Sequence, residues 1–261
     1  QSLEAVRQVL GAGRPGDVFS ICAIDVSCDL IGESFDGSTA RSIETALAKL
    51  VTRTPLGSTD FVAGLSAAAD LLDGRPEAKF VVYIGDGPGI EGVDPGGFYR
   101  CITRLAESRI VVSSIGIGSN VNWPLLAATA AGTGGLFADG TADTGGAAGA
   151  VAAAHVHGIT WPSGAVCTLE SGTTIRLLPS RLPPLRSDRE TIVFADGNAG
   201  GGSLDVMFDA SQGALHHGAE STRLAIPAVA PRDANVYLVE LVRNALPTDG
   251  VFLPLLGRDS L

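Results

Sequence analysis

One carboxylate in this sequence follows an apolar run and stands between glycines. The run KFVVYI covers residues 79–84, and Asp86 comes after it between Gly85 and Gly87. A short run rich in β-branched and aromatic residues predicts a buried strand. A carboxylate at the end of such a strand is costly unless a helix N-terminus or a cation compensates its charge. Asp86 is therefore a candidate ligand of a divalent metal ion.

A second group of polar side chains comes just before a predicted helix. The segment PLGSTD presents the hydroxyl groups of Ser58 and Thr59. Hydroxyl and carboxylate oxygens suit Mg²⁺ or Mn²⁺ and suit zinc poorly. A plainer interpretation stays open, in which Thr59 or Asp60 only caps the helix and Asp86 is a loop acid that faces water.

The segments that must position these residues alternate between helix and strand. Helical spacing or capping signals predict helices at 2–10, 41–51, 60–72 and 98–108, and one more that Asn122 caps with Pro124 in its first turn. Apolar runs predict strands at 17–31, 79–84, 109–118 and 136–138, with 33–35 as a further edge. Continuously apolar strands that alternate with helices are typical of a parallel sheet covered on both faces. Residues 1–139 are therefore predicted to form a doubly wound α/β domain, in which ligands bind beyond the carboxyl ends of the strands.

The second half of the chain has a different character. Residues 140–155 are rich in Ala and Gly and form either a linker or a helix. Short strand-like runs separated by Gly, Pro and Asp follow in 156–230, which predicts an antiparallel sheet or small sandwich. The tail, 231–261, contains a predicted helix at 233–246 with Asp233 as its N-cap, and can begin a further region.

The composition limits the class of partner. The chain has 261 residues, a formal net charge of -10 and a pI near 4.8, with lysine only at 49 and 79. This acidic balance argues against a nucleic-acid backbone or an anionic membrane surface as the main partner. No apolar run approaches the ~20 residues of a membrane span. A cationic partner or a metal ion fits better.

Other chemistry finds little support in the sequence. Its 4 cysteines have neither a C-x-x-C pair nor zinc-like spacing, so they are interpreted as small core residues without disulfides. The glycines around Asp86 fail the dinucleotide pattern because Ile90 stands where a third glycine is needed. The histidines fall outside the predicted α/β domain and are interpreted as surface or linker residues. The arginine-rich loop 180–190 is interpreted as a turn braced by Asp188 and Glu190.

Several segments together resemble a known family. In order, GDVFSICAIDVSCDLI, LAKLVTRTPLGSTDFVAGLSAAADLL, AKFVVYIGDG and RIVVSSIGIGSNVNWPLLAATAAGTGGLFAD resemble a von Willebrand factor type A domain. The sequence is most similar to the bacterial and inter-alpha-trypsin-inhibitor heavy-chain branch, and the resemblance covers about residues 1–139. It implies a metal-ion-dependent adhesion site, in which a divalent ion at the upper edge of the sheet is completed by an acidic group of the partner.

The resemblance assigns the site only in part. Thr59 matches the threonine that contacts the ion, and Asp86 matches the aspartate of the family's Thr-Asp-Gly, although Gly85 replaces that threonine. An Asp-x-Ser-x-Ser turn should follow the first, central strand and precede the first helix. Because Gln1 already lies in or beside that helix, we expect this strand and turn to be absent from the sequence.

One segment imitates the missing motif. Asp25 and Ser27 in DVSCD begin it correctly, but Asp29 stands where the second serine belongs. The segment is also predicted to lie within the second strand with no helix after it. We therefore do not assign it to the metal site.

The sequence thus favours a non-enzymatic protein-binding module. Thr59 and Asp86 are its candidate ligands for Mg²⁺ or Mn²⁺, and Ser58 and Gly87 are candidate contacts for a protein partner that presents an acidic side chain. Neither nucleic-acid binding nor membrane insertion is expected. Two alternatives stay open: a degenerate domain that binds protein without metal, and a scaffold domain of a larger enzyme complex. The compartment also stays open, with an extracytoplasmic or cell-surface location compatible with the resemblance.

Overall fold

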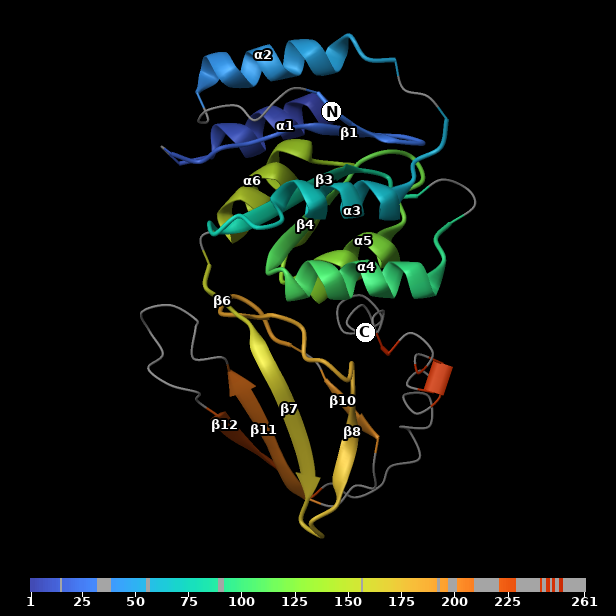
Figure 1. Cartoon of the computed structure of the whole chain (residues 1–261), viewed down its shortest axis with the longest axis vertical. Coiled ribbons are helices and arrows are strands. Elements are labelled where there is room, and N and C mark those ends of the chain that lie inside the picture. Colours follow the sequence, from blue (N-terminus) through green and yellow to red (C-terminus); the bar gives the residue numbers. More distant parts are fainter. Residues whose placement is uncertain are drawn as a thin grey trace. The chain divides into compact units, whose positions relative to one another are not determined.

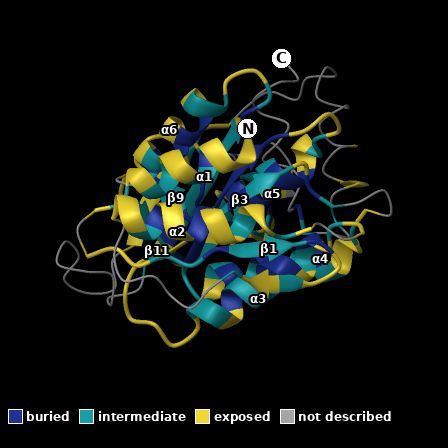
Figure 2. Cartoon of the chain, turned by 90° about the horizontal axis from the view of Figure 1, so that it is seen from above, coloured by how far each residue is buried: buried dark blue, intermediate teal, exposed yellow. Residues whose placement is uncertain are grey.

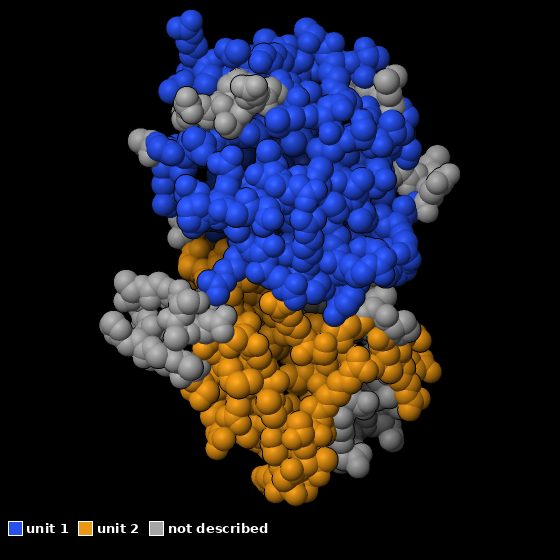
Figure 3. All heavy atoms as spheres, in the orientation of Figure 1, with its two compact units in different colours: residues 1–156 blue, residues 157–261 orange. Residues whose placement is uncertain are grey.

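The chain divides into two compact units, residues 1–156 and 157–261 (Figure 3). The structure is a computed structural model that describes residues 1–14, 16–31, 39–54, 57–88, 92–155, 157–191, 193–196, 201–208, 221–228, 240, 243–244, 246 and 249–250. Within these ranges, no helix combines the length and the apolar character needed to cross a lipid bilayer.

The centre of the first unit is a three-stranded parallel sheet (Figure 1). It consists of β3 (Lys79–Gly85), β4 (Ile110–Gly116) and β5 (Phe137–Asp139), with β4 in the middle. Every residue of β4 is buried, whereas Tyr83 is the one buried residue of β3. The predicted parallel α/β sheet is confirmed, and the carboxyl ends of its strands meet at one edge. The complete doubly wound order stays a prediction.

The segment 17–31 differs from its prediction as one buried strand. It forms a two-stranded antiparallel hairpin of β1 (Cys22–Ile24) and β2 (Cys28–Leu30), separate from the β3–β4–β5 sheet. The prediction is wrong because Asp25 turns the chain: its carboxylate accepts a hydrogen bond from the Ser27 N–H at 3.2 Å, and its own N–H donates to the Ser27 carbonyl at 2.9 Å. The predicted edge 33–35 lies outside the described residues.

Six helices of the described chain belong to the first unit. They are α1 (Ser2–Gly11), α2 (Ala40–Val51), α3 (Phe61–Leu72), α4 (Pro95–Glu107), α5 (Trp123–Thr133) and α6 (Thr144–Ala154). Asn122 caps α5 through a bond from the Leu125 N–H, as predicted. The undecided segment 140–155 is largely helical, so its alanines outweigh its glycines.

Helices α1 and α6 lie next to each other (Figure 2). Small side chains pack them against one face of the sheet. Because successive strand residues point to opposite faces, Ile115 and Ile117 face these helices while Val112 faces α5. The Thr133 hydroxyl of α5 accepts a hydrogen bond from the Val112 N–H at 3.0 Å and donates one to the Thr129 carbonyl at 2.7 Å, which joins the helix to the strand. The core on the α1 and α6 side is made of Ala5, Ile115, Ile117, Ala147, Ala148 and Val151.

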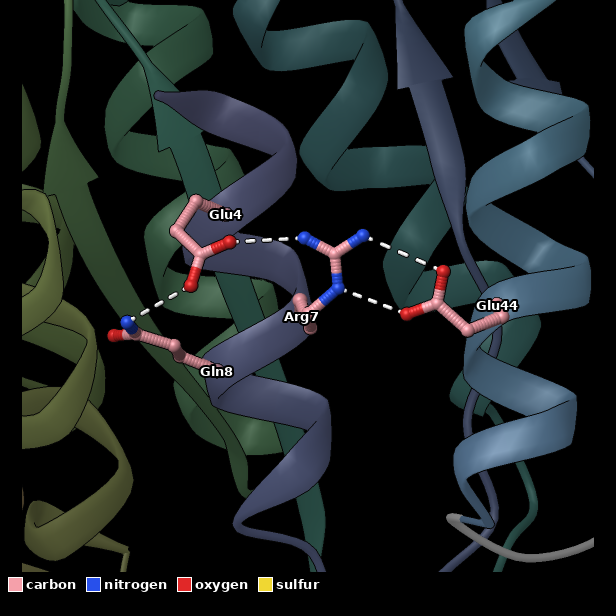
Figure 4. A network of polar contacts seen from close by, with 4 residues as sticks. All are labelled: Glu4, Arg7, Gln8 and Glu44. Carbon is pink, nitrogen blue, oxygen red and sulfur yellow. Dashed lines mark hydrogen bonds and ion pairs between the residues drawn. The ribbon is translucent and has the colours of Figure 1, made fainter.

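An exposed polar network joins α1 to α2 (Figure 4). The guanidinium group of Arg7 donates to Glu44 of α2 at 2.8 and 3.4 Å and to Glu4 at 2.9 Å, and Gln8 also donates to Glu4. The hydrogen bond from Arg7 holds the pKa of Glu44 below its ordinary value. Because the network is open to water and salt, it orients the two helices more than it stabilises them.

The second unit is an antiparallel β structure, as predicted. Its main sheet has five strands in the order β10, β8, β7, β11, β12, and β6 pairs with β9 in a second sheet. The strands are β6 (Ile159–Thr160), β7 (Pro162–Leu169), β8 (Thr174–Leu178), β9 (Leu185–Arg186), β10 (Phe194–Asp196), β11 (Gly202–Phe208) and β12 (Ser221–Ile226). Most of the predicted helix 233–246, including Asp233, lies outside the described residues.

The structure shows the surroundings of the cysteines, of His155 and of Arg186. All 4 cysteines are free thiols, with Cys101 and Cys167 buried. His155, the half-buried residue just after α6, packs its ring on Phe80 of β3 with centroids 4.6 Å apart. The predicted brace in the loop 180–190 is confirmed for Arg186, whose guanidinium binds Asp188 at 2.6 Å.

Candidate functional site

Asp86 is exposed at the carboxyl end of β3, where it borders the loop after β4. Its carbonyl accepts a hydrogen bond from the Asn122 N–H at 2.7 Å. Gly118 has a φ of +134°, and a Cβ placed there would lie 3.1 Å from the Cβ of Asp86. Only a glycine permits both this backbone conformation and this close approach. The loop 118–122 therefore supports one side of Asp86.

Gly87 turns the chain immediately after Asp86. Its φ is +104°, and its N–H donates a hydrogen bond of 3.0 Å to the phenolic oxygen of Tyr83. The same hydroxyl donates to the Gly87 carbonyl at 3.3 Å. Gly87 is buried, and these two hydrogen bonds to Tyr83 fix its backbone. Its contact with a partner stays a prediction.

Tyr83 connects this turn to the helix that follows the Thr59 loop. Burial raises the pKa of Tyr83 to about 12; the nearby charge of Asp86 adds to this shift, and the bond with Gly87 opposes it. The hydroxyl therefore keeps its proton at neutral pH and can donate to Gly87. On its other side, the Tyr83 ring packs edge-on against Phe61, the first residue of α3.

The loop 57–60 precedes α3 and carries the candidate hydroxyl groups. Ser58 is exposed and Thr59 is half-buried. Asp60 is the N-cap of α3 and accepts a hydrogen bond from the Ala63 N–H at 3.0 Å. The capping alternative is therefore confirmed for Asp60.

The hairpin turn after β1 supports the loop 57–60. The Asp60 N–H donates a hydrogen bond of 2.7 Å to the Asp25 carbonyl. The Asp25 carboxylate is buried and pairs with Nη2 of Arg53 at 2.8 Å, while the same nitrogen lies 2.7 Å from Asp29. Hydrogen bonds to Asp29 and Asp25 raise the pKa of Arg53. The strand β2, rather than a helix, follows this turn, which agrees with leaving Asp25 and Ser27 out of the metal site.

Arg53 and Tyr83 were not predicted as site residues, and only Tyr83 carries a signal in the sequence. Tyr83 is the one side chain in the run 79–84, apart from Lys79, with a polar end, and a buried tyrosine usually bonds its hydroxyl to a partner. Arg53 follows α2 directly, but its partners Asp25 and Asp29 lie far away in the sequence. Only the tertiary structure identifies such a contact.

The candidate oxygen ligands are of the chemical type that binds a divalent ion, but they are fewer than such an ion needs. A hydroxyl of Thr59 or Ser58 and the carboxylate of Asp86 are hard ligands of the type Mg²⁺ and Mn²⁺ prefer. Among the described residues, however, no group of three or more His, Cys, Asp or Glu side chains is arranged to hold a metal. The Asp25 carboxylate already has Arg53 as its counter-charge. Ligation by these residues stays a prediction, and they would supply only part of a coordination shell, which water or a partner's carboxylate would have to complete.

Comparisons with known proteins identify the fold. No protein-family model and no curated protein sequence matches the chain significantly. The solved structure of von Willebrand factor type A from Catenulispora acidiphila is similar at a TM-score of 0.54 and 14% identity, over 89% of this chain and 62% of that chain. The conserved hypothetical protein BatB from Bacteroides thetaiotaomicron gives a TM-score of 0.48 and 14% identity, over 59% of this chain and 84% of that one. Proximal thread matrix protein 1 from the mussel byssus, with a zinc-occupied MIDAS motif, gives a TM-score of 0.48 and 17% identity, over 57% of this chain and 38% of that chain.

The first of these likenesses confirms the fold that the sequence resemblance implied. The chain has the von Willebrand factor type A fold, in which helices surround a parallel sheet, together with an antiparallel β unit. The chain spans 62% of the length of the Catenulispora acidiphila structure. At 14% identity this likeness establishes the architecture and leaves the activity to be argued from the site.

Proposed function

We propose that this chain is a non-enzymatic protein-binding module. Its binding surface is the carboxyl edge, defined by the loop 57–60, residues 86–88 and the loop 118–122. The observation that carries the proposal is the exposed carboxylate of Asp86 beyond the end of a parallel strand, where such sheets bind their ligands. The Phe61–Tyr83 contact ties the loop 57–60 to the same edge.

In its specific form, the proposal gives this edge a divalent ion. Thr59 and Asp86 would ligate Mg²⁺ or Mn²⁺, and Ser58 and Gly87 would border the partner's acidic side chain. A bound cation supplies the attraction for an acidic partner that a chain of net charge -10 otherwise lacks. With few protein ligands, affinity for the free ion is expected to be weak, and the partner's carboxylate strengthens it.

Titration with Mn²⁺, followed by its effect on water proton relaxation, tests the specific form. Asp86→Asn and Thr59→Val should each weaken Mn²⁺ binding about tenfold or more, because each removes one of few ligands. Glu77→Gln is the matched control for Asp86→Asn, since Glu77 is exposed just before the other end of β3. Equal Mn²⁺ affinity in the wild type, Asp86→Asn and Glu77→Gln would rule out a metal site at Asp86.

Binding of a protein partner without metal is the second candidate, and one observation favours it. Among the described residues, no group of three or more His, Cys, Asp or Glu side chains is arranged to hold a metal ion. If the protein retains its partner in EDTA, and the Asp86→Asn variant does not retain it, metal-free binding is favoured over binding through a divalent ion.

Catalysis by this chain itself has little local support, and a scaffold role in a larger enzyme complex stays an open alternative. In the described part of the chain, Ser113 Oγ lies 3.4 Å from Nε2 of His155. Ser113 is fully buried, and its oxygen also accepts a hydrogen bond from the Leu136 N–H. A substrate cannot reach this hydroxyl, so the pair supports packing rather than nucleophilic catalysis. Turnover in a hydrolase substrate panel would overturn the non-enzymatic proposal.

A further inference from the structure

The connection between α2 and α3 contacts Asp25 at both of its ends. Arg53 stands just after the last turn of α2, and its Nη2 lies 2.8 Å from Oδ2 of Asp25. Asp60 stands just before α3, and its N–H donates to the carbonyl of Asp25 at 2.7 Å. The side chain of Asp25 thus holds the start of this connection and its backbone holds the end. Ser58 and Thr59 lie between the two attachments.

Burial makes the first attachment the decisive one. The side chain of Asp25 is 6% exposed and that of Arg53 is 18% exposed. A carboxylate so far from water must be paired, and removing its partner leaves an uncompensated charge. Asp25 also shapes its own turn by accepting the Ser27 N–H. If Arg53 is lost, the turn is therefore expected to move toward water and to take the acceptor of the Asp60 N–H with it.

Arginine suits this position better than lysine. The Nη2 atom lies between Asp25 and Asp29, at 2.8 and 2.7 Å, while Nε also donates to Asp29 at 3.3 Å. The planar guanidinium group can hold two carboxylates at once through separate N–H groups, whereas an ammonium group is a single point charge on a flexible stem. A lysine is thus expected to preserve the charge and only part of the geometry.

We propose that Arg53 is a positioning residue for the carboxyl edge. It keeps Asp25 buried, Asp25 keeps Asp60 in place, and Asp60 fixes the preceding Ser58 and Thr59 relative to α3. Arg53 acts on binding through Asp25 and contacts neither the ion nor the partner. This inference rests on the proposed function, because Ser58 and Thr59 matter only if the carboxyl edge binds.

Amide hydrogen exchange measured by NMR tests the positioning role without any ligand. Arg53→Met should speed exchange of the Asp60 N–H about tenfold or more, since that group loses its fixed acceptor. Exchange at Ile115, in the fully buried strand β4, should accelerate by a clearly smaller factor, because that amide reports the overall stability of the unit. Arg104→Met is the matched control, because Arg104 pairs with the exposed Asp70 in the same unit. Arg53→Lys should give an intermediate rate at Asp60, and it keeps the test usable if Arg53→Met does not fold.

A second arm measures Mn²⁺ affinity by water proton relaxation in the same proteins. Arg53→Met should bind Mn²⁺ about tenfold more weakly than Arg104→Met, with partial recovery in Arg53→Lys. Unchanged exchange at Asp60 in both Arg53 variants would overturn the proposal, as would equal acceleration at Asp60 and Ile115, which indicates a general loss of stability. If the wild type binds no Mn²⁺, the metal form of the proposed function fails, and the exchange arm still decides whether Arg53 positions the loop.

Discussion

The ring of Phe61 meets the ring of Tyr83 edge-on, with centroids 4.8 Å apart and planes inclined by 79°. Phe61 begins α3 and is 1% exposed, while Tyr83 belongs to β3 and holds the Gly87 turn through its hydroxyl. The two rings therefore connect the segment after Thr59 with the segment that contains Asp86. A disturbance on one side of this pair is expected to reach the other.

Removal of the Tyr83 hydroxyl should loosen the turn at Gly87. Tyr83→Phe keeps the ring contact with Phe61 but leaves the buried amide of Gly87 without its acceptor. We expect a loss of about 1–3 kcal/mol in the free energy of unfolding. Urea denaturation measures this change, and Phe61→Leu serves as the counterpart that removes the ring contact and keeps the hydroxyl. An unchanged midpoint for Tyr83→Phe would show that the bond to Gly87 contributes nothing.

The phenol of Tyr83 should also give the stability a dependence on alkaline pH. Burial raises its pKa to about 12 in the folded protein, against a value of 10.0 for an ordinary tyrosine. The unfolded chain therefore loses this proton first as the pH rises. The contribution is fully present below pH 10 and declines as the pH increases from about 10 to about 12. Absorbance at 295 nm should show a late tyrosine titration step, and Tyr83→Phe should remove it.

A side chain at Gly118 should push the loop 118–122 away from Asp86. Gly118→Ala combines a φ of +134° with a Cβ only 3.1 Å from the Cβ of Asp86. Gly74→Ala is a suitable control, since Gly74 also has a positive φ, +67°, and no atom within 4 Å of its added Cβ. We expect Gly118→Ala to cost about 1–3 kcal/mol of unfolding free energy and Gly74→Ala distinctly less. Equal denaturation midpoints for the two variants would contradict the close approach.

The exposed network on α1 should matter far less than the buried pair at Arg53. Arg7→Met removes bonds to Glu44 and Glu4 that are all open to solvent. Such pairs are screened by salt, so we expect no resolvable change in the thermal midpoint at 0.15 M NaCl. Arg53→Met should lower that midpoint clearly because Asp25 is buried. The idea fails if the two variants shift the midpoint equally.

The helices and strands that the sequence predicted best are those marked by local patterns, such as an apolar stripe or a capping residue. Helix α2 follows from an apolar stripe at helical spacing, and the start of α5 follows from Asn122 and Pro124. The hairpin β1–β2 was missed because Asp25 makes its turn without glycine or proline. For the segment of α6 the sequence predicted either a linker or a helix, because Ala favours helix and Gly disfavours it. Packing on Ala5, Ile115 and Ile117 stabilises the helix in the folded chain.

In the candidate site, too, the sequence identified residues at local boundaries and missed the contacts that hold them. Asp86 and Thr59 could be named from the sequence because each stands at a recognisable boundary of a strand or helix. What holds them could not be predicted, since the bond from Tyr83 to Gly87 and the ion pair from Arg53 to Asp25 depend on how the chain folds back on itself. Periodicity indicates which residues face a core and says nothing of which polar groups meet there.

The parallel register of the central sheet has a consequence for how the chain folds. Lys79 pairs with Ile110 and Ser114 pairs with Phe137, so each ladder closes only after an entire intervening helix has been brought back. Closing such loops costs entropy before the strands gain their bonds, whereas Cys167 and Ile175 pair across a short hairpin. During refolding, the backbone N–H and C=O groups of β3 therefore stay unpaired until β4 is in place, and they can pair with a strand of another molecule. Recovery of the first unit from urea should decrease as protein concentration rises, while formation of the β7–β8 hairpin should be independent of concentration.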